Sequence, residues 1–391
     1  MRDVAEHAGV SAQTVSNLVN NRLRQMSDET RLRIEGAMEQ LGYHPNLTAR
    51  SLRSARTTTI GFLLLDEGAR YLADPMTDQI IAGVGDVARD RGYSVLIHAG
   101  LPGPPDRGLL RPVLESRVDG VLLFLSGPPE QRGWYPARAA ELGVPTVVLE
   151  EAGPDGGGQM SVTADNRDGA RRLADHLIAA GHTRIAFIAA RQPWPMVEQR
   201  HLGYCEALAA AGLERNPDFE LFEGIWDAAD AGNMVDRLLE LPEPPTAVMG
   251  GNDLLAIGVM RQARARGLRV PEDLAVTGFN DFAFAEFVEP PLTTVHVPGY
   301  EIGRTAAQLL IEHLDGEAEG RPQVTLPVEL RLRGSTLPHE HPRGGRRTWQ
   351  LSRRGDRWKA GVRSSPAWAP AWARPSRASS RPRARWSSAA T

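Results

Sequence analysis

The sequence has one cysteine, Cys205, and no apolar run that approaches the roughly 18 residues of a membrane-spanning helix. A single cysteine excludes an internal disulfide framework and a zinc cluster made of cysteines. The chain begins with polar residues instead of a charged and then apolar leader, which predicts a cytoplasmic protein with no membrane partner. Its 391 residues, 41% hydrophobic and 24% charged, are enough for two or three globular domains.

Signatures of catalysis and cofactor binding are also lacking. The glycine-rich stretches GVGDVA and GPDGGGQ do not form the GxGxxG pattern that opens a helix after a strand in nucleotide-binding folds. No serine or cysteine stands in a motif that places it beside a general base. The stretch HEHP at 339–342 offers metal-ligating side chains, but it begins a segment without structural periodicity. We therefore expect no enzyme, no cofactor and no bound metal.

Lysine is absent before Lys359, and the net charge of −3 conceals a strong asymmetry. Residues 339–391 carry 13 basic and 2 acidic residues, whereas residues 57–338 have a net charge of −16 and residues 1–56 one of +2. A mildly basic head on an acidic body is typical of a small nucleic-acid-binding module carried by a body that does not touch DNA.

The basic tail, residues 339–391, contains five of the eight tryptophans among Arg, Pro, Ser and Ala residues. It has neither helical nor strand periodicity, and this composition predicts disorder. Two alternatives are open: the tail binds nucleic acid, or it is an out-of-frame translation of a GC-rich gene.

Two short helices joined by a glycine turn are predicted in DVAEHAGVSAQTVSNLVNN, residues 3–21. Asp3 is expected to cap the first helix and Gly9 to end it in a left-handed turn. Ser11 is expected to cap the second helix, over residues 12–20. The apolar positions expected to be buried are Val4, Ala5, Ala8, Val15, Leu18 and Val19. The pattern fits both a helix-turn-helix, whose second helix enters a DNA major groove, and an ordinary helical hairpin.

A third helix is predicted in MSDETRLRIEGAMEQLGY, with Ser27 or Asp28 as its cap and Gly42 at its end. Its apolar stripe is expected at Leu32, Ile34, Ala37, Met38 and Leu41. The basic stretch that follows, to Thr57, has no stripe wide enough for a core and is typical of a solvated linker.

From residue 59 apolar strands alternate with amphipathic helices, which is the pattern of parallel sheets in α/β domains. Strands are predicted at 59–65, 93–99, 119–125, 145–150, 184–190, 219–224, 246–251 and 275–279. Helices are predicted at 78–91, 109–115, 137–142, 167–180, 199–211, 228–239 and 253–266. The alternation restarts midway, which indicates two doubly wound lobes with a ligand cleft at the carboxyl ends of their strands.

The order of these features resembles the lac repressor family of bacterial transcription regulators over residues 1–338. The motifs that carry the resemblance are DVAEHAGVSAQTVSNLVNN, SDETRLRIEGAMEQLGYHPNLTARSLRS, TIGFLLLD, GHTRIAFI, NDLLAIGVMRQARARGLRVPEDLAVTGFND and PPLTTV. The resemblance implies an all-α helix-turn-helix DNA-binding head followed by an α/β, two-lobed, periplasmic-binding-protein-like (type I) effector domain.

The resemblance also implies domain boundaries. The DNA-binding head would span residues 1–45, the hinge helix or linker 46–56, the effector-binding and dimerisation body 57–338, and the tail 339–391. Within the body, the first lobe would comprise about 57–162 and 294–325, and the second about 163–293 and 326–338.

By the same resemblance, the second helix reads DNA bases through Ala12, Gln13 and Asn17. Relatives commonly have Arg where Asn17 stands, so an adenine contact is favoured there over the guanine contact common in the family. The residues expected at phosphates are Ser11, Thr14 and Ser16.

The linker corresponds to a hinge helix that folds on specific DNA. Asn46, Ala49 and Arg50 would line the minor groove, and Leu52 would wedge between the central base pairs. Dimerisation through the first lobe would present two heads to a palindromic operator. The tail has no leucine heptad of the kind that makes some relatives tetrameric, so a homodimer is expected.

In the cleft, the resemblance points to six effector-binding residues: Glu150, Arg200, Trp226, Asn252, Asp253 and Asn280. For three of them a structural alternative is open: Trp226 in a core, Asp253 as a helix cap, Glu150 in a solvated loop. Met76 and Thr77 stand where relatives often have two aromatic residues, so no aromatic wall is expected on the first lobe unless Tyr71 supplies it. Amides, one Arg, one Glu and an indole face suit a carbohydrate.

The function implied is that of a transcriptional regulator, expected to be a repressor, whose operator affinity changes when the effector alters the angle between the lobes. The alternative is a sugar-binding solute receptor, which has a similar body but requires an export signal and no DNA-binding head.

Changing Leu52 to Ala should weaken specific operator binding by roughly 2 kcal/mol, or about 30-fold, because the wedge supports DNA bending. Binding to random DNA should be unchanged, since no wedge forms there. Fluorescence anisotropy on both duplexes measures the two affinities, and equal losses on both would refute the wedge assignment.

Overall fold

The computed structural model describes residues 1–19, 26–43, 56–66, 74–100, 108–152, 158–224, 226 and 228–336. Several predicted features lie outside these residues: the hinge residues Asn46, Ala49, Arg50 and Leu52, Tyr71, the HEHP stretch and the tail 339–391. None of the helices within the described ranges has the length and apolar character needed to cross a membrane.

The described part of the N-terminal head contains three helices, α1 (Arg2–His7), α2 (Ala12–Val19) and α3 (Asp28–Gln40). Its core contains Val4, Ala5, Ala8, Val15, Ile34 and Ala37. Gly9 adopts the predicted left-handed turn, with φ of 63°. The Ser11 and Ser27 hydroxyls accept hydrogen bonds from the backbone N–H groups of Thr14 (3.1 Å) and Thr30 (3.2 Å), so both predicted serine caps are confirmed.

Three residues of the head were predicted wrongly. Asp3 does not cap α1, because the helix already begins at Arg2 and Asp3 lies within its first turn. Leu32 is 63% exposed, since it precedes Ile34 by two positions and therefore lies on the opposite face of α3. Leu41 is 45% exposed because it is the C-cap, beyond the last helical turn.

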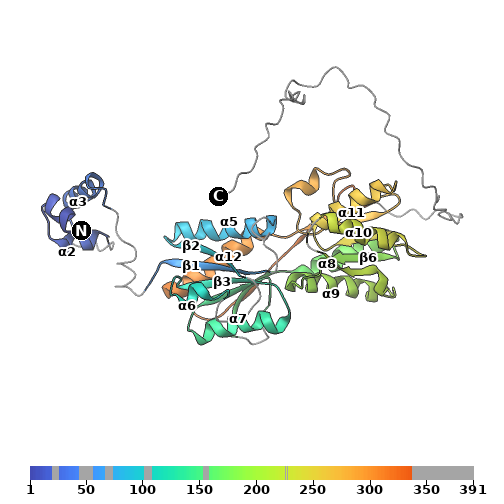
Figure 1. Cartoon of the computed structure of the whole chain (residues 1–391), viewed down its shortest axis with the longest axis horizontal. Helices are drawn as coiled ribbons and strands as arrows, with labels where there is room; N and C mark the ends of the chain where they lie inside the picture. Colours follow the sequence, from blue (N-terminus) through green and yellow to red (C-terminus); the bar gives the residue numbers. More distant parts are fainter. Residues whose placement is uncertain are drawn as a thin grey trace, which may run out of the picture. The chain divides into compact units, whose positions relative to one another are not determined.

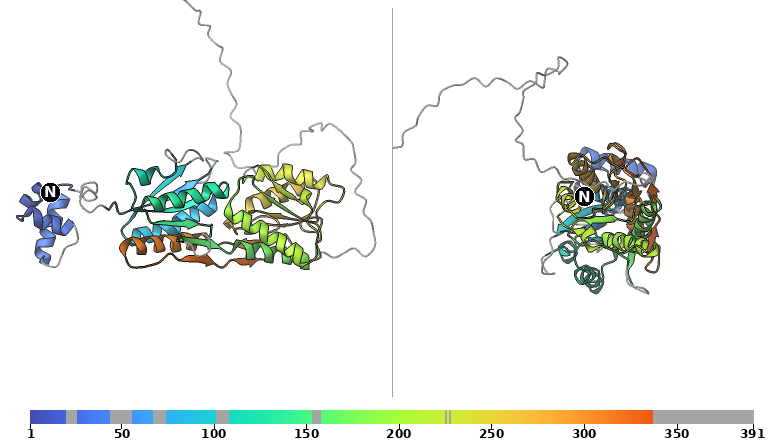
Figure 2. Two further views of the ribbon diagram at one scale, coloured as in Figure 1. Left: turned by 90° about the horizontal axis from the view of Figure 1, so that it is seen from below. Right: turned by 90° about the vertical axis from the view of Figure 1, so that its right-hand side faces the viewer.

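The first lobe is built on a six-stranded sheet with strand order β11-β5-β4-β3-β1-β2, and all its pairs are parallel. The strands are β1 (Thr59–Leu65), β2 (Ser94–Gly100), β3 (Gly120–Leu125), β4 (Thr146–Leu149), β5 (Met160–Ala164) and β11 (Gln323–Leu326). Helices α5 (Pro75–Asp90) and α12 (Gly299–Asp315) cover one face, and α6 (Arg111–Leu114) and α7 (Pro129–Glu141) the other (Figures 1 and 2). Side chains of β1 alternate between the two cores, which is why its whole run is apolar.

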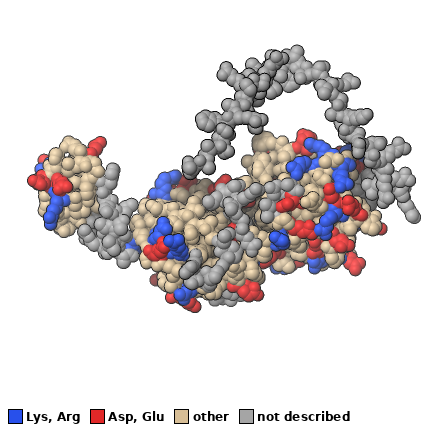
Figure 3. All heavy atoms as spheres, viewed as in Figure 1, with Lys and Arg blue, Asp and Glu red and all other residues tan. Residues whose placement is uncertain are grey.

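The second lobe repeats this plan on a four-stranded parallel sheet with the order β7-β6-β8-β9. The strands are β6 (Ile185–Ala189), β7 (Glu220–Phe222), β8 (Ala247–Gly250) and β9 (Ala275–Thr277). Helices α8 (Asn166–Ala179) and α9 (Pro195–Ala210) pack on one face, and α10 (Ala228–Leu239) and α11 (Asp253–Ala265) on the other. On the face drawn in Figure 3, acidic and basic side chains are interspersed over this lobe.

The chain passes between the lobes three times. It crosses between β5 and α8, between β10 (Thr294–His296) and α12, and between β11 and β12 (Glu329–Arg331). β10 and β12 form a small antiparallel pair, and bridges at Thr293 and His296 join β10 to the edge of the second sheet. Three crossings hold the two lobes beside each other, so a cleft forms where their strands end.

Where the two helices on one face of each sheet meet, glycines allow close approach. A Cβ on Gly83 of α5 would collide with the backbone carbonyl of Tyr300 on α12, and one on Gly303 with that of Ile80. In the second lobe, a Cβ on Gly203 of α9 would collide with the Arg167 carbonyl on α8. These contacts explain why glycine is retained inside helices, where it is normally unfavourable.

Replacing Gly83 by Ala should destabilise the chain by about 2 kcal/mol, because the methyl group forces α5 and α12 apart. Gly85 on the same helix provides the control: a Cβ there meets no atom within 4 Å. Gly85→Ala should be neutral or stabilise by up to about 1 kcal/mol through helix propensity. Denaturant unfolding of both variants measures the difference, and equal effects would contradict a glycine-dependent contact.

Candidate functional site

The Ser11 cap fixes the start of helix α2, and the burial of Val15 determines which side of the helix faces solvent. Besides accepting from the Thr14 N–H, the Ser11 hydroxyl lies 2.8 Å from that of Thr14, while Val15 anchors the opposite side of the helix at 0% exposure. Ser11, Ala12 and Gln13 are exposed, and Ser16 and Asn17 are half-buried. The six residues predicted to contact DNA from the head therefore lie along the cap and the first two turns of one short helix.

The side chains of Gln13 and Asn17 are hydrogen-bonded to each other. The Gln13 amide donates through Nε2 to Asn17 Oδ1 at 3.0 Å, as their spacing of four residues on a helix allows. This bond leaves the Gln13 carbonyl as an acceptor and the Asn17 NH₂ as a donor. One acceptor and one donor side by side match the donor and acceptor that adenine displays in the major groove.

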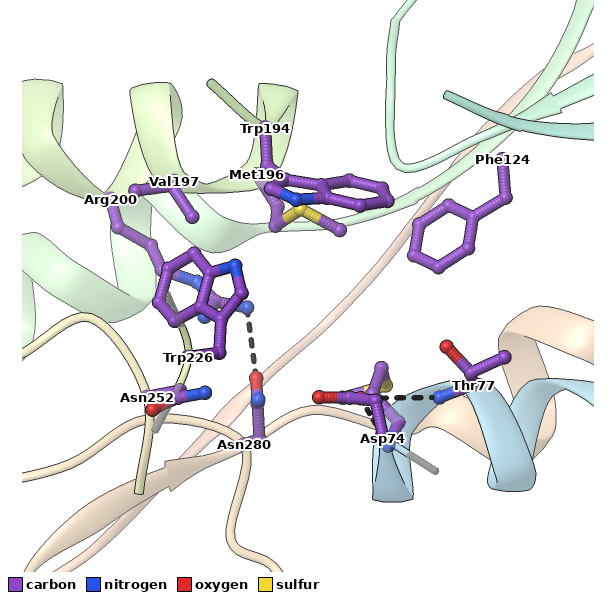
Figure 4. Close-up of a pocket in the computed structure, with 11 residues that line it drawn as sticks. Asp74, Thr77, Phe124, Trp194, Met196, Val197, Arg200, Trp226, Asn252 and Asn280 are labelled. Carbon is purple, nitrogen blue, oxygen red and sulfur yellow. Dashed lines mark hydrogen bonds between the residues drawn. The ribbon is translucent and has the colours of Figure 1, made fainter. Parts of the chain in front are cut away.

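A pocket lies between the lobes at the carboxyl ends of their strands. The empty space between its lining atoms, open solvent included, is about 400 Å³, and its lining comprises Asp74, Met76, Thr77, Phe124, Trp194, Met196, Val197, Arg200, Trp226, Asn252 and Asn280 (Figure 4). Four of the six residues predicted for the cleft, Arg200, Trp226, Asn252 and Asn280, are in this lining. All four belong to the second lobe.

Arg200 is the centre of the pocket's polar network. It is only 4% exposed, and its guanidinium donates to Asn166 Oδ1 (2.9 Å), the Gly251 carbonyl (2.7 Å) and Asn280 Oδ1 (2.9 Å). The guanidinium carbon lies 4.0 Å from the centre of the Phe279 ring. Burial lowers the pKa of Arg200 to about 10, so the group remains cationic at neutral pH.

The other two predicted residues, Glu150 and Asp253, are buried beneath the pocket and do not line it. Glu150 accepts from the Ala164 N–H (3.2 Å) and the Asn166 amide (2.7 Å). Asp253 accepts from the Phe282 N–H (2.7 Å) and the Thr294 hydroxyl (2.6 Å). Burial raises the pKa of each carboxyl group to about 7, although the nearby Arg200 charge opposes the shift.

The helix cap proposed as an alternative role for Asp253 belongs to its neighbour. Asn252 Oδ1 accepts from the Leu255 N–H at 2.9 Å and so caps α11. Asn280 follows β9 with φ of 108°, a conformation that residues other than glycine rarely adopt but that Asn tolerates better than most. These two asparagines place their amides at adjacent strand ends.

The first lobe contributes residues that the sequence analysis missed. Phe124 at the end of β3 lines the pocket and lies 4.8 Å from Trp194 of the second lobe, measured between ring centres, so the first lobe supplies one aromatic side chain that was not predicted. Asp74 caps α5 by accepting from the Met76 N–H (2.8 Å), and burial raises the pKa of its carboxyl group. The Thr77 hydroxyl is buried and has no hydrogen-bond partner among the described residues.

One side of the cleft is closed by contacts between the lobes. Arg132 of α7 donates two hydrogen bonds to Glu198 of α9, at 3.0 and 2.9 Å, and a third to Glu151 at 2.9 Å. Close by, the Gly127 N–H donates to the Pro193 carbonyl at 2.9 Å. The Arg132 side chain is 3% exposed and that of Glu198 is 40% exposed, so the guanidinium is removed from water while the Glu198 carboxylate stays partly solvated.

A helix-turn-helix head joined to a two-lobed body with a polar and aromatic cleft defines a ligand-responsive DNA-binding regulator. Residues 1–46 match the family model for bacterial regulatory proteins of the lacI family, and residues 174–336 match that for a periplasmic binding protein-like domain.

The chain is also similar to individual regulators. It is 33% identical over 343 residues to the HTH-type transcriptional repressor CytR of Escherichia coli (strain K12), covering 86% of this chain and 96% of that one. The structure of the CelR–cellobiose complex matches with a TM-score of 0.65 and 33% identity, over 85% of this chain and 98% of that chain. The lac repressor dimer bound to operator and the anti-inducer ONPF matches with a TM-score of 0.75 and 30% identity, over 86% and 98%.

The chain therefore belongs to the lacI family of bacterial regulatory proteins, and it is a sequence-specific DNA-binding transcriptional regulator. Two of the alternatives left open by the sequence, the helical hairpin and the solute receptor, are not favoured by these relatives.

Changing Glu198 to Gln should lower the free energy of unfolding by about 1–2 kcal/mol, because the buried Arg132 guanidinium loses one of its two carboxylate partners. Glu206 on the same helix is the matched control: it pairs with Arg167 at the surface, without crossing between lobes. Glu206→Gln should cost less than about 0.5 kcal/mol. Denaturant unfolding measures both, and a similarly small loss in both would contradict a stabilising contact between the lobes.

Proposed function

We propose that this regulator is a repressor that binds a palindromic operator as a homodimer and whose operator affinity is controlled by a carbohydrate bound in the interlobe pocket. The observation that carries the proposal is the chemistry of the pocket, in which a buried guanidinium and two amides lie beside indole and phenyl faces. The CelR regulator, a relative 33% identical in sequence, is known in complex with cellobiose.

Carbohydrates combine apolar C–H faces with hydroxyl groups that both donate and accept. Trp226, Trp194 and Phe124 offer aromatic faces, while the Asn252 and Asn280 amides and Asp74 offer donors and acceptors (Figure 4). The buried Thr77 hydroxyl gains from any ligand that supplies a hydrogen-bond partner, because leaving it unpaired costs free energy. A purely apolar ligand would leave these polar groups unpaired.

For the head, the supporting observation is the exposed Gln13–Asn17 amide pair. We propose that Ala12, Gln13 and Asn17 read bases, with adenine opposite the amide pair, and that Ser11, Thr14 and Ser16 contact phosphates. The roles of Asn46, Ala49, Arg50 and Leu52 in the minor groove stay proposals that follow from the family.

Coupling between pocket and DNA requires that the linker be fixed to the first lobe, and hydrogen bonds and an ion pair hold the residues at this junction. Asp119, just before β3, accepts from the N–H groups of Thr57 (2.6 Å) and Thr58 (2.7 Å) and from the Thr57 hydroxyl (2.9 Å). Arg56 pairs with Asp315 at the end of α12, at 3.4 Å. A change in lobe orientation can therefore be transmitted to the linker through these bonds.

The test is operator binding by the full chain, using a duplex selected from a random pool and a panel of sugars that includes cellobiose. Specific binding should be at least about 10³-fold tighter than binding to random DNA. One class of sugar should change the operator affinity by about 5–150-fold, downward for an inducer or upward for a corepressor. Absence of sequence preference would contradict a DNA-binding regulator, and preference without any sugar response would contradict the carbohydrate.

Changing Arg200 to Ala should leave operator affinity intact and abolish the sugar response, because the pocket's polar network loses its centre. Arg171→Ala is the control, since Arg171 lies on the exposed side of α8 and, among the described residues, pairs with Asp168 and Asp175. Trp226→Ala removes an indole face without touching the guanidinium and should also weaken the response. Anisotropy titrations measure all three, with thermal unfolding as the check of folding, and a retained response in Arg200→Ala would remove Arg200 from the site.

A further inference from the structure

Three side chains with different metal-binding atoms meet in the second lobe, outside the pocket. His201 and Cys205 are one turn apart on α9, and Glu220 is the first residue of β7. One ligand atom of each, the imidazole nitrogen, the thiol sulfur and a carboxylate oxygen, lies within 4.8 Å of the other two. None of the three lines the interlobe pocket or belongs to the network of Arg200.

A single imidazole nitrogen faces both partners. His201 Nε2 is 2.7 Å from Glu220 Oε2 and 3.5 Å from Cys205 Sγ. Ligands of a tetrahedral zinc ion, at about 2.0–2.3 Å from the metal, are separated from one another by about 3.3–3.6 Å. The sulfur–nitrogen distance already has this value, and the nitrogen–oxygen distance needs to open by only about 0.6 Å when a metal replaces the shared proton.

The surroundings hold the imidazole in this orientation. The His201 ring lies 5.4 Å from the Phe187 ring, 6.0 Å from Tyr204 and 5.1 Å from Phe222, between ring centres. All three ligand residues are partly buried, so the site is shielded yet reachable from solvent. Preorganised ligands of this kind bind metal without a large loss of side-chain entropy.

Arg215 both positions the Glu220 carboxylate and competes with a metal ion for it. It donates to both carboxylate oxygens of Glu220, at 2.9 and 2.7 Å, and so holds that side chain toward His201. Its positive charge also disfavours a cation at the same carboxylate. Removing Arg215 should therefore free Glu220 for a metal, which offers a test that depends on this geometry.

We propose that His201, Cys205 and Glu220 form a zinc-binding site in the second lobe, with solvent as the fourth ligand. The donor set of one nitrogen, one sulfur and one oxygen suits Zn²⁺ better than Mg²⁺ or Ca²⁺, which prefer oxygen ligands alone. A bound ion would tie α9 to β7. This proposal is independent of the carbohydrate pocket and of operator binding.

Cobalt substitution tests the sulfur ligand directly. Adding Co²⁺ to the reduced full chain should produce the near-ultraviolet charge-transfer band of a cobalt–thiolate bond. Because Cys205 is the only cysteine, the band can arise from no other residue. Cys205→Ser should abolish the band, and His201→Gln should abolish or strongly weaken it. His176→Gln, which removes a histidine bonded to Thr336 elsewhere in the lobe, should leave it unchanged.

Zinc binding itself is measured by thermal unfolding and by competition with a chromophoric chelator. Zn²⁺ should raise the unfolding midpoint of the chain by several degrees, and this shift should disappear in Cys205→Ser. Arg215→Gln should bind Zn²⁺ about 3–10-fold more tightly, as expected when a competing positive charge is removed. No cobalt–thiolate band, or a zinc shift that persists in Cys205→Ser and so arises at other residues, would overturn the proposal.

Discussion

The cleft depends on one buried charge, the Arg200 guanidinium. A guanidinium removed from water is tolerated only if its N–H groups find acceptors, and here they are supplied by Asn166 at the start of α8, the Gly251 carbonyl after β8 and Asn280 after β9. Meeting that requirement fixes the ends of three elements relative to one another. Two further lining residues are placed by the same framework, because Asn252 follows Gly251 directly after β8 and the Trp226 ring lies beside Gly251.

The buried carboxyl groups of Glu150 and Asp253 belong to the framework that surrounds Arg200. Glu150 binds the amide of Asn166, whose oxygen accepts from Arg200, so it supports the guanidinium through an intermediate residue. Asp253 ties the start of α11 to Thr294, near the crossing between lobes. Both therefore stabilise the framework that a ligand would meet. Their raised pKa values reflect burial and require no role in contacting an effector.

The periodicity of the sequence located most elements, because alternating and helical apolar patterns follow directly from burial on one or two faces. The helix at 228–239 agrees with α10 at both ends. Elements after residue 279, such as α12, were not predicted individually. The strand β5 was also missed, because it is short and follows a glycine-rich stretch. At the site, the sequence does not distinguish Phe124 and Trp194 from core residues, although both line the pocket. It indicates Glu150 and Asp253 as effector ligands, although both lie beneath the pocket. The direction of a side chain at a strand end depends on tertiary contacts that periodicity does not contain.

A single strand links the pocket to the linker. β3 begins directly after Asp119, which holds the backbone of Thr57 and Thr58, and it carries Phe124 near its carboxyl end in the pocket. At about 3.3 Å per residue, the two sites are roughly 17 Å apart along one central strand. A central strand paired on both sides bends little. In the proposed mechanism, effector binding would therefore act on the linker by moving the first lobe as a unit, and the contacts that resist such movement include those of Arg132, Gly127 and Phe124 with the second lobe.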